Sequence, residues 1–424
     1  MKVLWFSNAE IVGSNKDIGC SWISSLEAEI SKVPDIHLGI VFNSNQFDSW
    51  QFKIGNTSYF PVRTEPVRNK FKKLYNRFKH NIEDENIIQF YLNIVQEFKP
   101  DIIHIFGTES DFGLLIPRTN IPCVIHLQGN LTLNDHKWFI GLSALDILRH
   151  SDKLLLLKGH GLFHGYWVNK KSAAREKRIF KACKYFMGRT DFDRRLSSVL
   201  SPDSEYFHCE EMIRPAFYLN EWRSKKADSD FVIMSTIRNN IYKGLETILE
   251  CKIILNQLFT GCNIIWKIAG LKEEYEISYL VERIYKTKFR DIDIQLLGPL
   301  QEDELIGQLV NADLYIHPSH IENSPNGICE AMLLGMPVIA TYAGGTPGIL
   351  TDRKEGLLVQ DGDPYSLAGA IIELIKDRNF ANKLGINGRL RARIRHEPRK
   401  IVEDLLNIYS SILLKNDKLD KLAI

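Results

Sequence analysis

The sequence is short of the features that mark several common classes of protein. Its 424 residues hold seven cysteines, an odd number without any C-x-x-C pair, so the usual spacing of thiol redox and structural zinc sites is missing. No stretch approaches about 18 consecutive apolar residues, which excludes a bilayer-spanning helix. The opening residues, Met1–Asn8, lack the apolar region and cleavage site of a signal peptide. We therefore expect a protein of the reducing cytoplasm.

The sequence also lacks a large excess of positive or negative charge. The 54 Lys and Arg residues against 52 Asp and Glu give a formal net charge of +2, too little to favour nucleic-acid binding by the whole molecule. Hydrophobic residues make up 44% and charged residues 25%, which is typical of a globular chain. At about 100–200 residues per domain, this length predicts two or three domains.

Short β-rich runs alternate with segments of helical period along the chain. The first half predicts helices at 19–32, 69–79 and 85–97, and strands at 2–7, 37–42, 101–107, 122–127, 185–188 and 205–209. The second half predicts helices at 244–258, 274–285, 302–312, 326–334 and 364–376, and strands at 231–235, 263–268, 293–297, 314–318, 337–341 and 356–359. Strands separated by helices predict mostly parallel sheets.

The periodicity fails between residues 213 and 230, where charge, Ser and Pro gather as in a domain linker. We therefore predict an α/β protein of two doubly wound, Rossmann-like lobes, with residues 1–218 in the first and 219–396 in the second. Ligands of such sheets bind beyond the carboxyl ends of the strands, so two facing lobes would place a cleft between them.

The most informative stretch is residues 317–341, which reads as strand, polar loop, helix, glycine stop and strand. Glu322 lies in the loop and Glu330 lies one turn into the helix that begins near Asn326. The free N–H groups of a helix N-terminus attract phosphate, and Gly327 allows close approach. Two carboxylates beside a phosphate would address hydroxyls on either side of it, one suiting a ribose and the other a hexose. Considered alone, an E-x7-E pair is far more often part of a capped surface helix with two solvated Glu, and only the surrounding residues favour the functional interpretation.

The residues around this pair resemble the retaining GT-B glycosyltransferases of family 4, whose mark is E-x7-E between P-S and E-A-M-x-x-G-x-P-V-I-A-T. The match runs through 318–341 and continues at 343–347 and 355–359. The form E-N-S-P-N, in place of the commoner E-G-F-G, resembles a bacterial surface-polysaccharide subgroup. The resemblance implies a GT-B fold, with the C-terminal helices, 397–424, returning to the first lobe. It covers residues 231–375 well and the first lobe loosely.

The resemblance also implies roles for residues of the second lobe. Glu322 would hold hydroxyls of the donor sugar and Glu330 the ribose diol. The segment S-T-I-R-N-N-I-Y-K-G at 235–244 is similar to the family's G-R-x4-K-G, with Ile237 in place of the usual glycine. The donor diphosphate would be neutralised by two side chains and three backbone positions: Arg238, Lys243, Asn326, Gly327 and Ile328.

In the first lobe the resemblance is thinner. His126, at the end of a predicted strand, matches the family's histidine near the donor sugar, although a strand-end His is more often structural. Gly19 follows the first strand in a loop that would approach the phosphate and the acceptor. Arg189 is a further residue expected near the cleft, with no role assigned.

No metal and no cofactor are expected, and the nucleotide sugar, a UDP-, GDP- or ADP-sugar, would be a substrate. Three D-x-D tripeptides occur, at 191–193, 291–293 and 361–363. Each is explained by a helix cap, a strand start or a turn, so none is taken as a cation site.

Two stretches of the first half are strongly basic. Residues 63–80 contain seven Lys and Arg against one Glu, and residues 149–190 contain eleven against two acids. Such segments can lie on an anionic membrane, where a lipid-linked acceptor would be found, or can form ordinary solvated helix faces.

The sequence thus predicts a hexosyltransferase that acts with retention on a saccharide or lipid-linked saccharide acceptor, in bacterial surface-polysaccharide synthesis. Two alternatives stay open. A GT-B-fold nucleotide-sugar epimerase would need extra acid and base groups at the sugar, and a non-catalytic subunit would bind the donor without turnover.

Overall fold

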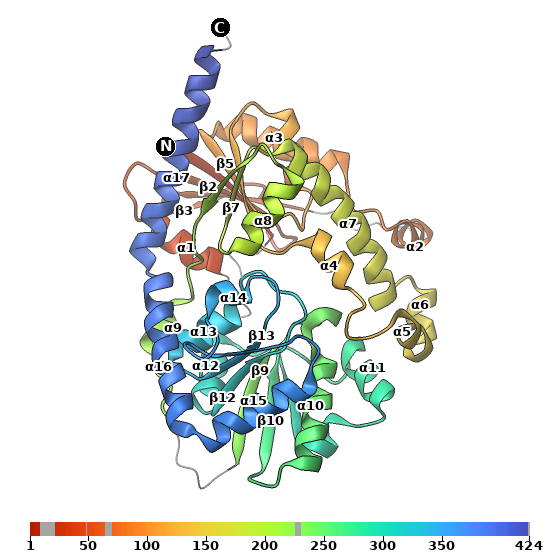
Figure 1. Cartoon of the computed structure of the whole chain (residues 1–424). Helices are drawn as coiled ribbons and strands as arrows, with labels where there is room; N and C mark the ends of the chain where they lie inside the picture. Colours follow the sequence, from red (N-terminus) through yellow and green to blue (C-terminus); the bar gives the residue numbers. More distant parts are fainter. Residues whose placement is uncertain (9–21, 48, 64–69, 225–229, 423–424) are drawn as a thin grey trace.

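A computed structural model of the chain describes residues 1–8, 22–47, 49–63, 70–224 and 230–422. It contains two α/β lobes, one above the other in Figure 1, each built on a mostly parallel sheet covered by helices. The expected architecture of two doubly wound lobes is confirmed. Gly19, expected near the phosphate, lies outside the described residues.

The N-terminal lobe is built on an eight-stranded sheet of order β3-β4-β2-β1-β5-β6-β7-β8, in which only β3 and β4 pair antiparallel. The β3–β4 hairpin is an addition that the sequence reading missed. The strands are β1 Lys2–Ser7, β2 His37–Asn43, β3 Phe52–Ile54, β4 Thr57–Val62, β5 Ile102–Phe106, β6 Cys123–His126, β7 Tyr185–Gly188 and β8 Glu205–His208. The helices are α1 Trp22–Ile30, α2 Lys70–Lys79, α3 Glu85–Phe98, the 3-10 helix η1 Phe112–Arg118, α4 Leu131–Lys137, α5 Ala144–His150, α6 Lys153–Leu157, α7 Leu162–Ala182 and α8 Asp191–Leu200.

The C-terminal lobe is built on a six-stranded parallel sheet of order β11-β10-β9-β12-β13-β14. The strands are β9 Phe231–Thr236, β10 Ile264–Ala269, β11 Ile294–Gly298, β12 Leu314–His317, β13 Val338–Thr341 and β14 Leu357–Val359. The helices are α9 Pro215–Leu219, η2 Ile241–Lys243, α10 Leu245–Leu258, α11 Glu276–Tyr285, η3 Phe289–Ile292, α12 Glu302–Val310, α13 Asn326–Leu334, α14 Thr346–Ile349, α15 Pro364–Lys376 and α16 Arg378–Arg395. The strand order reverses between β9 and β12, and this is where parallel sheets bind ligands.

The last helix, α17 (Pro398–Leu422), returns to the N-terminal lobe and runs along its side in Figure 1. Ile401, Leu405, Ile408 and Ile412 recur at helical spacing and pack into the core beside β1 and β2. Tyr409, which is fully buried, accepts a hydrogen bond from Trp5 Nε1 at 3.0 Å. The expected return of the C-terminal helix is therefore confirmed.

A second connection between the lobes has no counterpart in the sequence prediction. Residues 131–166 leave the N-terminal lobe and cross to the other lobe; we call this segment the arm. Trp138, Leu142 and Ile147 of the arm are buried in the hydrophobic core of the C-terminal lobe. Glu276 of α11 fixes the far end of the arm, because it accepts from Leu162 N at 2.7 Å and from Ser151 Oγ at 3.1 Å.

None of the helices within the described ranges combines the length and the apolar composition needed to cross a bilayer.

Candidate active site

The two glutamates of the E-x7-E pair are placed by β12, the loop that follows it, and α13. The helix runs from Asn326 to Leu334 and is capped by Gly335, whose φ of +88° is the left-handed conformation that glycine adopts freely. Packing by itself requires a glycine at position 327: a Cβ there would lie 2.1 Å from the Tyr315 hydroxyl and 2.5 Å from Thr236 Oγ1. Side chains of β9 and β12 thus pack so closely under the helix that only glycine fits at this position.

Glu322 is held by two groups of its own lobe. Lys243 Nζ lies 2.5 Å from Glu322 Oε1, and His317 Nε2 lies 2.8 Å from the same oxygen. Burial opposes ionisation, but Lys243 and His317 outweigh it and hold the pKa of Glu322 well below its usual range. Glu322 is therefore an ionised, oriented carboxylate, and Lys243, expected at the diphosphate, pairs with it in this structure.

Glu330 is paired with a residue that sequence reasoning missed. Arg214, in the segment that joins the lobes, donates to Glu330 Oε1 from Nε at 3.1 Å and from Nη2 at 2.7 Å. Arg214 also lies 3.4 Å from Glu302 at the start of α12. Burial raises the pKa of Glu330 and Arg214 opposes the rise. The sequence contained one feature that could have drawn attention to Arg214: it lies directly before Pro215, the first residue of α9.

The expected phosphate site is only partly free in the structure. The N–H of Ile328 donates to the Pro325 carbonyl at 3.0 Å, so this amide already has a partner. An anion at the start of the helix would instead be bound by the amides of Asn326 and Gly327. Arg238 follows β9 and is exposed. Because β9 ends at Thr236, Arg238 lies at the carboxyl edge of the sheet, and its charge weakly opposes the burial that raises the pKa of Glu330 and of Tyr242.

Ile237, which departs from the family pattern, is 3% exposed and belongs to the core of the C-terminal lobe. A Cβ at Gly270 would lie 2.4 Å from the Ile237 carbonyl oxygen, and Ile237 N donates to Ala269 at 2.9 Å. The glycine that the family has before its arginine is thus replaced here by a packed side chain beside β10, without moving Arg238 from the sheet edge.

A cavity of about 100 Å³ joins the two lobes at this point. Lys243, Glu322 and Tyr242 line it from the C-terminal lobe, and the N-terminal lobe contributes Gln128, Gly129, Asn130, Asn134 and Phe192. A larger hollow between α3, η1 and α7 lies away from the motif, and its charged residues are already paired as Arg118–Glu85 and Arg178–Glu83. The interlobe cavity is therefore the candidate active site.

His126 ends β6 as predicted, but its side chain is fully buried and is not among the described residues that line this cavity. Its ring lies 5.1 Å from Trp22 and stacks 5.5 Å from His104. Neither ring nitrogen has a hydrogen-bond partner in the part of the chain that is described. Burial, with the nearby charges of His104 and Arg189, holds the pKa of His126 well below its usual range. Its neighbours Gln128 and Gly129 line the cavity in its place.

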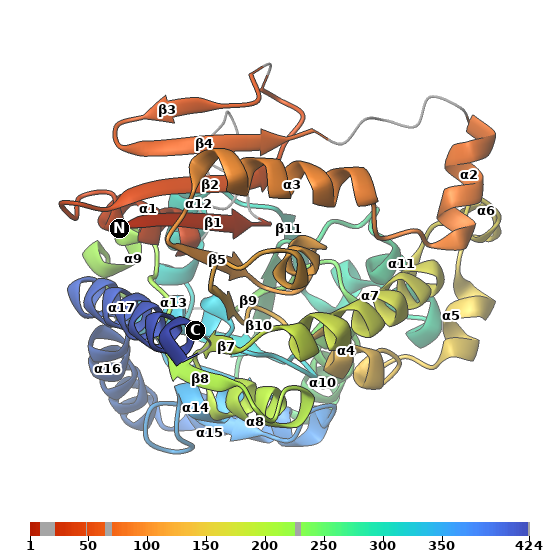
Figure 2. The same ribbon diagram turned by 90° about the horizontal axis from the view of Figure 1, so that it is seen from above.

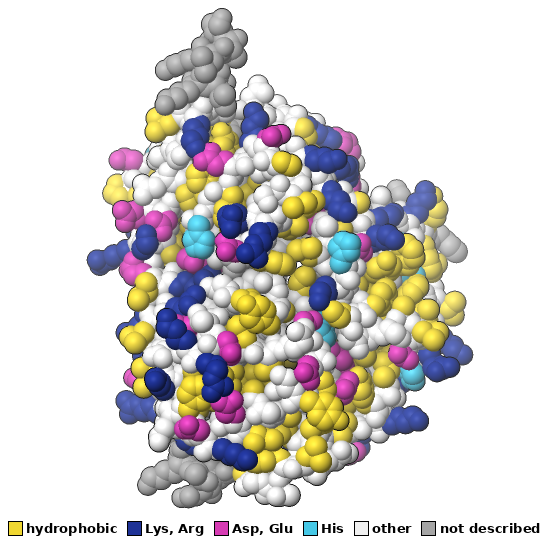
Figure 3. All heavy atoms as spheres, in the orientation of Figure 1, with side chains coloured by type: hydrophobic (Ala, Val, Ile, Leu, Met, Phe, Trp, Pro, Cys, Tyr) yellow, Lys and Arg dark blue, Asp and Glu magenta, His cyan; other side chains and the backbone are white. Residues whose placement is uncertain are grey.

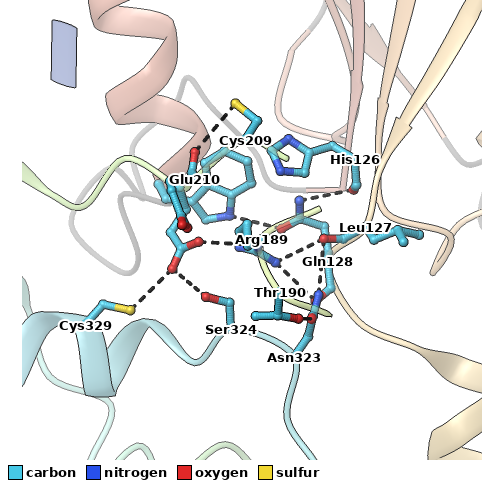
Figure 4. A network of polar contacts seen from close by, with 12 residues as sticks. His126, Leu127, Gln128, Arg189, Thr190, Cys209, Glu210, Asn323, Ser324 and Cys329 are labelled. Atoms are coloured by element: carbon cyan, nitrogen blue, oxygen red, sulfur yellow. Dashed lines mark hydrogen bonds and ion pairs between the residues drawn. The ribbon is translucent and has the colours of Figure 1, made fainter. Parts of the chain in front are cut away.

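Asn323 and Ser324, the residues that distinguish E-N-S-P-N from E-G-F-G, join the lobes (Figure 4). Asn323 Nδ2 donates to the carbonyls of Leu127 at 3.3 Å and Gln128 at 3.0 Å, and its Oδ1 accepts from Thr190 Oγ1 at 3.2 Å. Ser324 Oγ donates to the buried Glu211 at 2.6 Å. The substituted motif therefore fastens the loop that carries Glu322 to the N-terminal lobe.

Arg189, expected near the cleft, is a buried part of the same junction (Figure 4). Its Nη2 donates to Leu127 O at 3.1 Å, and its Nε lies 3.4 Å from Glu211. Burial opposes ionisation of Glu211, but the positive charges of Arg189, His396 and Arg395 hold the pKa of Glu211 below its usual range. Arg189 thus supports the end of β6 and does not line the cavity.

One group of side chains among the described residues could offer ligands to a metal ion: Glu211, Cys329 and His396. The donor set suits a cation poorly. Glu211 is already paired with the Arg189 guanidinium, and burial raises the pKa of the Cys329 thiol well above its usual range. Of the D-x-D tripeptides, Asp193 accepts from Arg189 N at 2.9 Å and Asp363 caps α15. These acids have structural partners.

Known proteins resemble this chain in sequence over its C-terminal half and in fold over nearly its whole length. Residues 219–391 match a family model described as Glycosyl transferases group 1. The capsular polysaccharide biosynthesis glycosyltransferase CapM of Staphylococcus aureus is 27% identical over 47% of this chain and 51% of its own length. The amylovoran biosynthesis glycosyltransferase AmsK of Erwinia amylovora is 29% identical over 34% of this chain and 35% of its own length. The chain thus spans about half or less of these curated relatives.

Solved structures match over nearly the whole chain. Sucrose-phosphate synthase of Thermosynechococcus elongatus has a TM-score of 0.72 at 16% identity and covers 98% of this chain and 99% of its own. Anabaena HepE, solved with UDP and glucose, has a TM-score of 0.64 at 15% identity, covering 97% and 100%. The chain therefore has the GT-B fold of these structures, and its C-terminal half carries the match to the glycosyl transferases of group 1.

Proposed function

We propose that this chain is a glycosyltransferase that moves a hexose from a nucleoside-diphosphate sugar to an acceptor hydroxyl, with retention at the anomeric carbon. One observation carries the proposal: the ionised Glu322, oriented by Lys243 and His317, faces a cavity whose other wall belongs to the opposite lobe. The family match over 219–391 supports the same reaction class.

The donor would lie along the edge where β9 and β12 end. Glu322 would accept hydrogen bonds from hydroxyls of the hexose. Glu330 would hold the ribose diol through Oε2, because both Arg214 bonds go to Oε1. The diphosphate would lie near Arg238, Lys243 and the amides of Asn326 and Gly327. As it departs, its growing negative charge would be stabilised by these fixed cations and dipoles.

Retention needs no enzymic nucleophile in this arrangement. The leaving phosphate can accept the proton of the acceptor hydroxyl on the face of the sugar from which it departs, while the new glycosidic bond forms on that same face. Lys243 would move from Glu322 toward the phosphate, and the residues around Gln128 would close the cavity to water. We propose that the reaction uses no metal ion, since Arg238 and the relocated Lys243 would neutralise the diphosphate.

The bacterial surface-polysaccharide setting rests on the names of CapM and AmsK, and the reducing cytoplasm remains a prediction from the cysteines. The acceptor would be a saccharide or lipid-linked saccharide. HepE was solved with UDP and glucose, so UDP-glucose is the first donor to test, followed by GDP- and ADP-sugars.

Incubation of the purified chain with radiolabelled donors, with and without EDTA, tests the proposal. Acceptor-dependent release of nucleotide supports transfer, and NMR of the product reports its anomeric configuration. Isomerised donor would favour the epimerase, and binding without turnover would favour the non-catalytic subunit.

Variants sharpen this test. Glu322→Gln and Lys243→Ala should each lower transfer by two or more orders of magnitude, the scale of losing a preorganised contact of about 2.7–4 kcal/mol. The matched controls Glu274→Gln and Lys376→Ala change exposed residues and should leave the rate unchanged. Near-normal rates in both site variants would contradict the proposed roles.

A further inference from the structure

The outer surface of the arm, with the neighbouring helix α2, exposes an unusual number of large apolar side chains. In α5 and α6 these are Leu145, Leu148, Leu154 and Leu157, which are 68%, 42%, 54% and 73% exposed. Trp167 at the start of α7 is 41% exposed. In Figure 3 hydrophobic side chains gather over α5 and α6, on the right of the molecule. A monomeric protein rarely leaves a continuous apolar surface of this kind without a partner.

Helix α2 adds Leu74, Tyr75 and Phe78 to this surface, with exposures of 39%, 56% and 47%. The Phe78 ring lies 5.4 Å from His164 of α7, and a Cβ at Gly159, just after α6, would lie 3.5 Å from the Phe78 ring. Figure 2 shows α2, α6 and the start of α7 side by side at one end of the molecule. These helices therefore form one surface, which we call the apolar end.

Basic residues surround the apolar end. Residues 140–171 contain five Lys and Arg and two acids, Asp146 and Asp152. Both acids are at the N-terminal turns of α5 and α6, where Asp152 caps α6 through Leu154 N at 2.8 Å. The cations are exposed instead: Arg149, Lys153, Lys158, Lys170 and Lys171. Lys170 Nζ lies 5.3 Å above the Trp167 ring, so charge and apolar area are interleaved.

Three arginines of the basic stretch 149–190 are engaged elsewhere in the protein. Arg175 and Arg189 are buried and donate to backbone carbonyls, and Arg178 pairs with Glu83. The structure thus removes these three arginines from the expected membrane-binding residues and adds exposed leucines, which a count of charges does not reveal.

We propose that the apolar end docks on the surface of an anionic lipid bilayer, with the leucines of α5 and α6 and Trp167 entering the headgroup region and the lysines contacting acidic lipids. The combination of short amphipathic helices, exposed leucines and a basic border has the chemistry of an interfacial membrane site. This inference does not depend on sugar transfer. It would place the cavity near the membrane, because α4, whose Asn134 lines the cavity, leads directly into α5.

Flotation of the full chain with vesicles tests the proposal. Vesicles of phosphatidylcholine with 30% phosphatidylglycerol should bind the protein at least tenfold better than phosphatidylcholine alone. Lys153→Glu with Lys158→Glu and Lys170→Glu should lower binding to the anionic vesicles by about 100-fold. Leu154→Ser with Leu157→Ser should lower it at least tenfold. Equal binding to both kinds of vesicle, or binding to neither, would overturn the proposal.

Matched changes elsewhere provide the control. Leu258→Ser, at a leucine 72% exposed on α10, and Lys376→Glu on α15 should leave vesicle binding unchanged. Tryptophan fluorescence should shift to the blue with anionic vesicles, and Trp167→Phe should abolish the shift. Light scattering tests whether a second copy of the chain covers this surface instead. If the wild type is a dimer that does not bind vesicles, and the double variant Leu154→Ser with Leu157→Ser is a monomer, the surface is a protein interface and the proposal fails.

Discussion

The pairing of Lys243 with Glu322 gives a prediction that needs no knowledge of the substrate. The side chains are 16% and 11% exposed, and Lys243 and His317 share the Glu322 oxygen Oε1. Removal of one partner from a buried pair costs about 3–5 kcal/mol. Partial exposure and the remaining His317 reduce this, so Lys243→Met should lower the free energy of unfolding by about 2–3 kcal/mol.

Urea unfolding of the wild type, Lys243→Met, Glu322→Gln and the double variant measures the coupling. The double variant should lose less stability than the sum of the single variants, by at least about 1.5 kcal/mol, because neither charge is then left alone. Additive losses, within about 0.5 kcal/mol, would refute the pairing.

The pH dependence of the same variants gives a second readout. The folded pKa of Glu322 lies below the unfolded value of about 4.3, so its contribution is complete above pH about 4.3 and is lost as the pH falls toward the folded pKa. The stability difference between the wild type and Glu322→Gln should therefore shrink below pH about 4. A difference that stays constant down to pH 3 would contradict the lowered pKa.

Three further predictions concern stability. Burial, and more weakly a nearby carboxylate, raises the pKa of Glu109 to about 7; the wild type should therefore lose stability as the pH rises from 5 to 8, and Glu109→Gln should remove about 2 kcal/mol of this loss in urea titrations. Gly327→Ala should lower the free energy of unfolding by about 1–3 kcal/mol, and Tyr315→Phe in the same chain should restore part of it, since the clash is with the tyrosine hydroxyl. Asn323→Ala should cost about 1–3 kcal/mol in chemical denaturation because three interlobe hydrogen bonds are lost, whereas Asn220→Ala, which removes one exposed local bond, should cost under about 0.5 kcal/mol.

The fold and the donor side of the site were predictable because their signals are local. The strand, loop and helix around Glu322 and Glu330 carry their own turn and cap residues, and α13 begins and ends at the predicted positions. Buried parallel strands are near-continuous apolar runs, so β9 and β12 were found within one or two residues of their ends.

The residues that sequence reasoning missed depend on contacts between distant segments. Arg214 lies where the periodicity fails, and only the structure shows that it binds Glu330. His126 was placed correctly at the end of a strand, but its exposure depends on Trp22 and His104, which pack over it from other elements. Asn323 has polar partners in the opposite lobe, and a motif comparison shows only that it differs from the usual glycine.

The arm has a consequence for how the chain acquires its structure. Trp138, Leu142 and Ile147 leave the ribosome before the lobe whose interior they complete. A fragment limited to residues 219–396 would therefore carry an unfilled apolar gap beside α10 and α11, and it should aggregate when expressed alone. The two lobes are therefore not independent folding units, because each has a core completed by residues from the other half of the chain. They should unfold together in one cooperative transition.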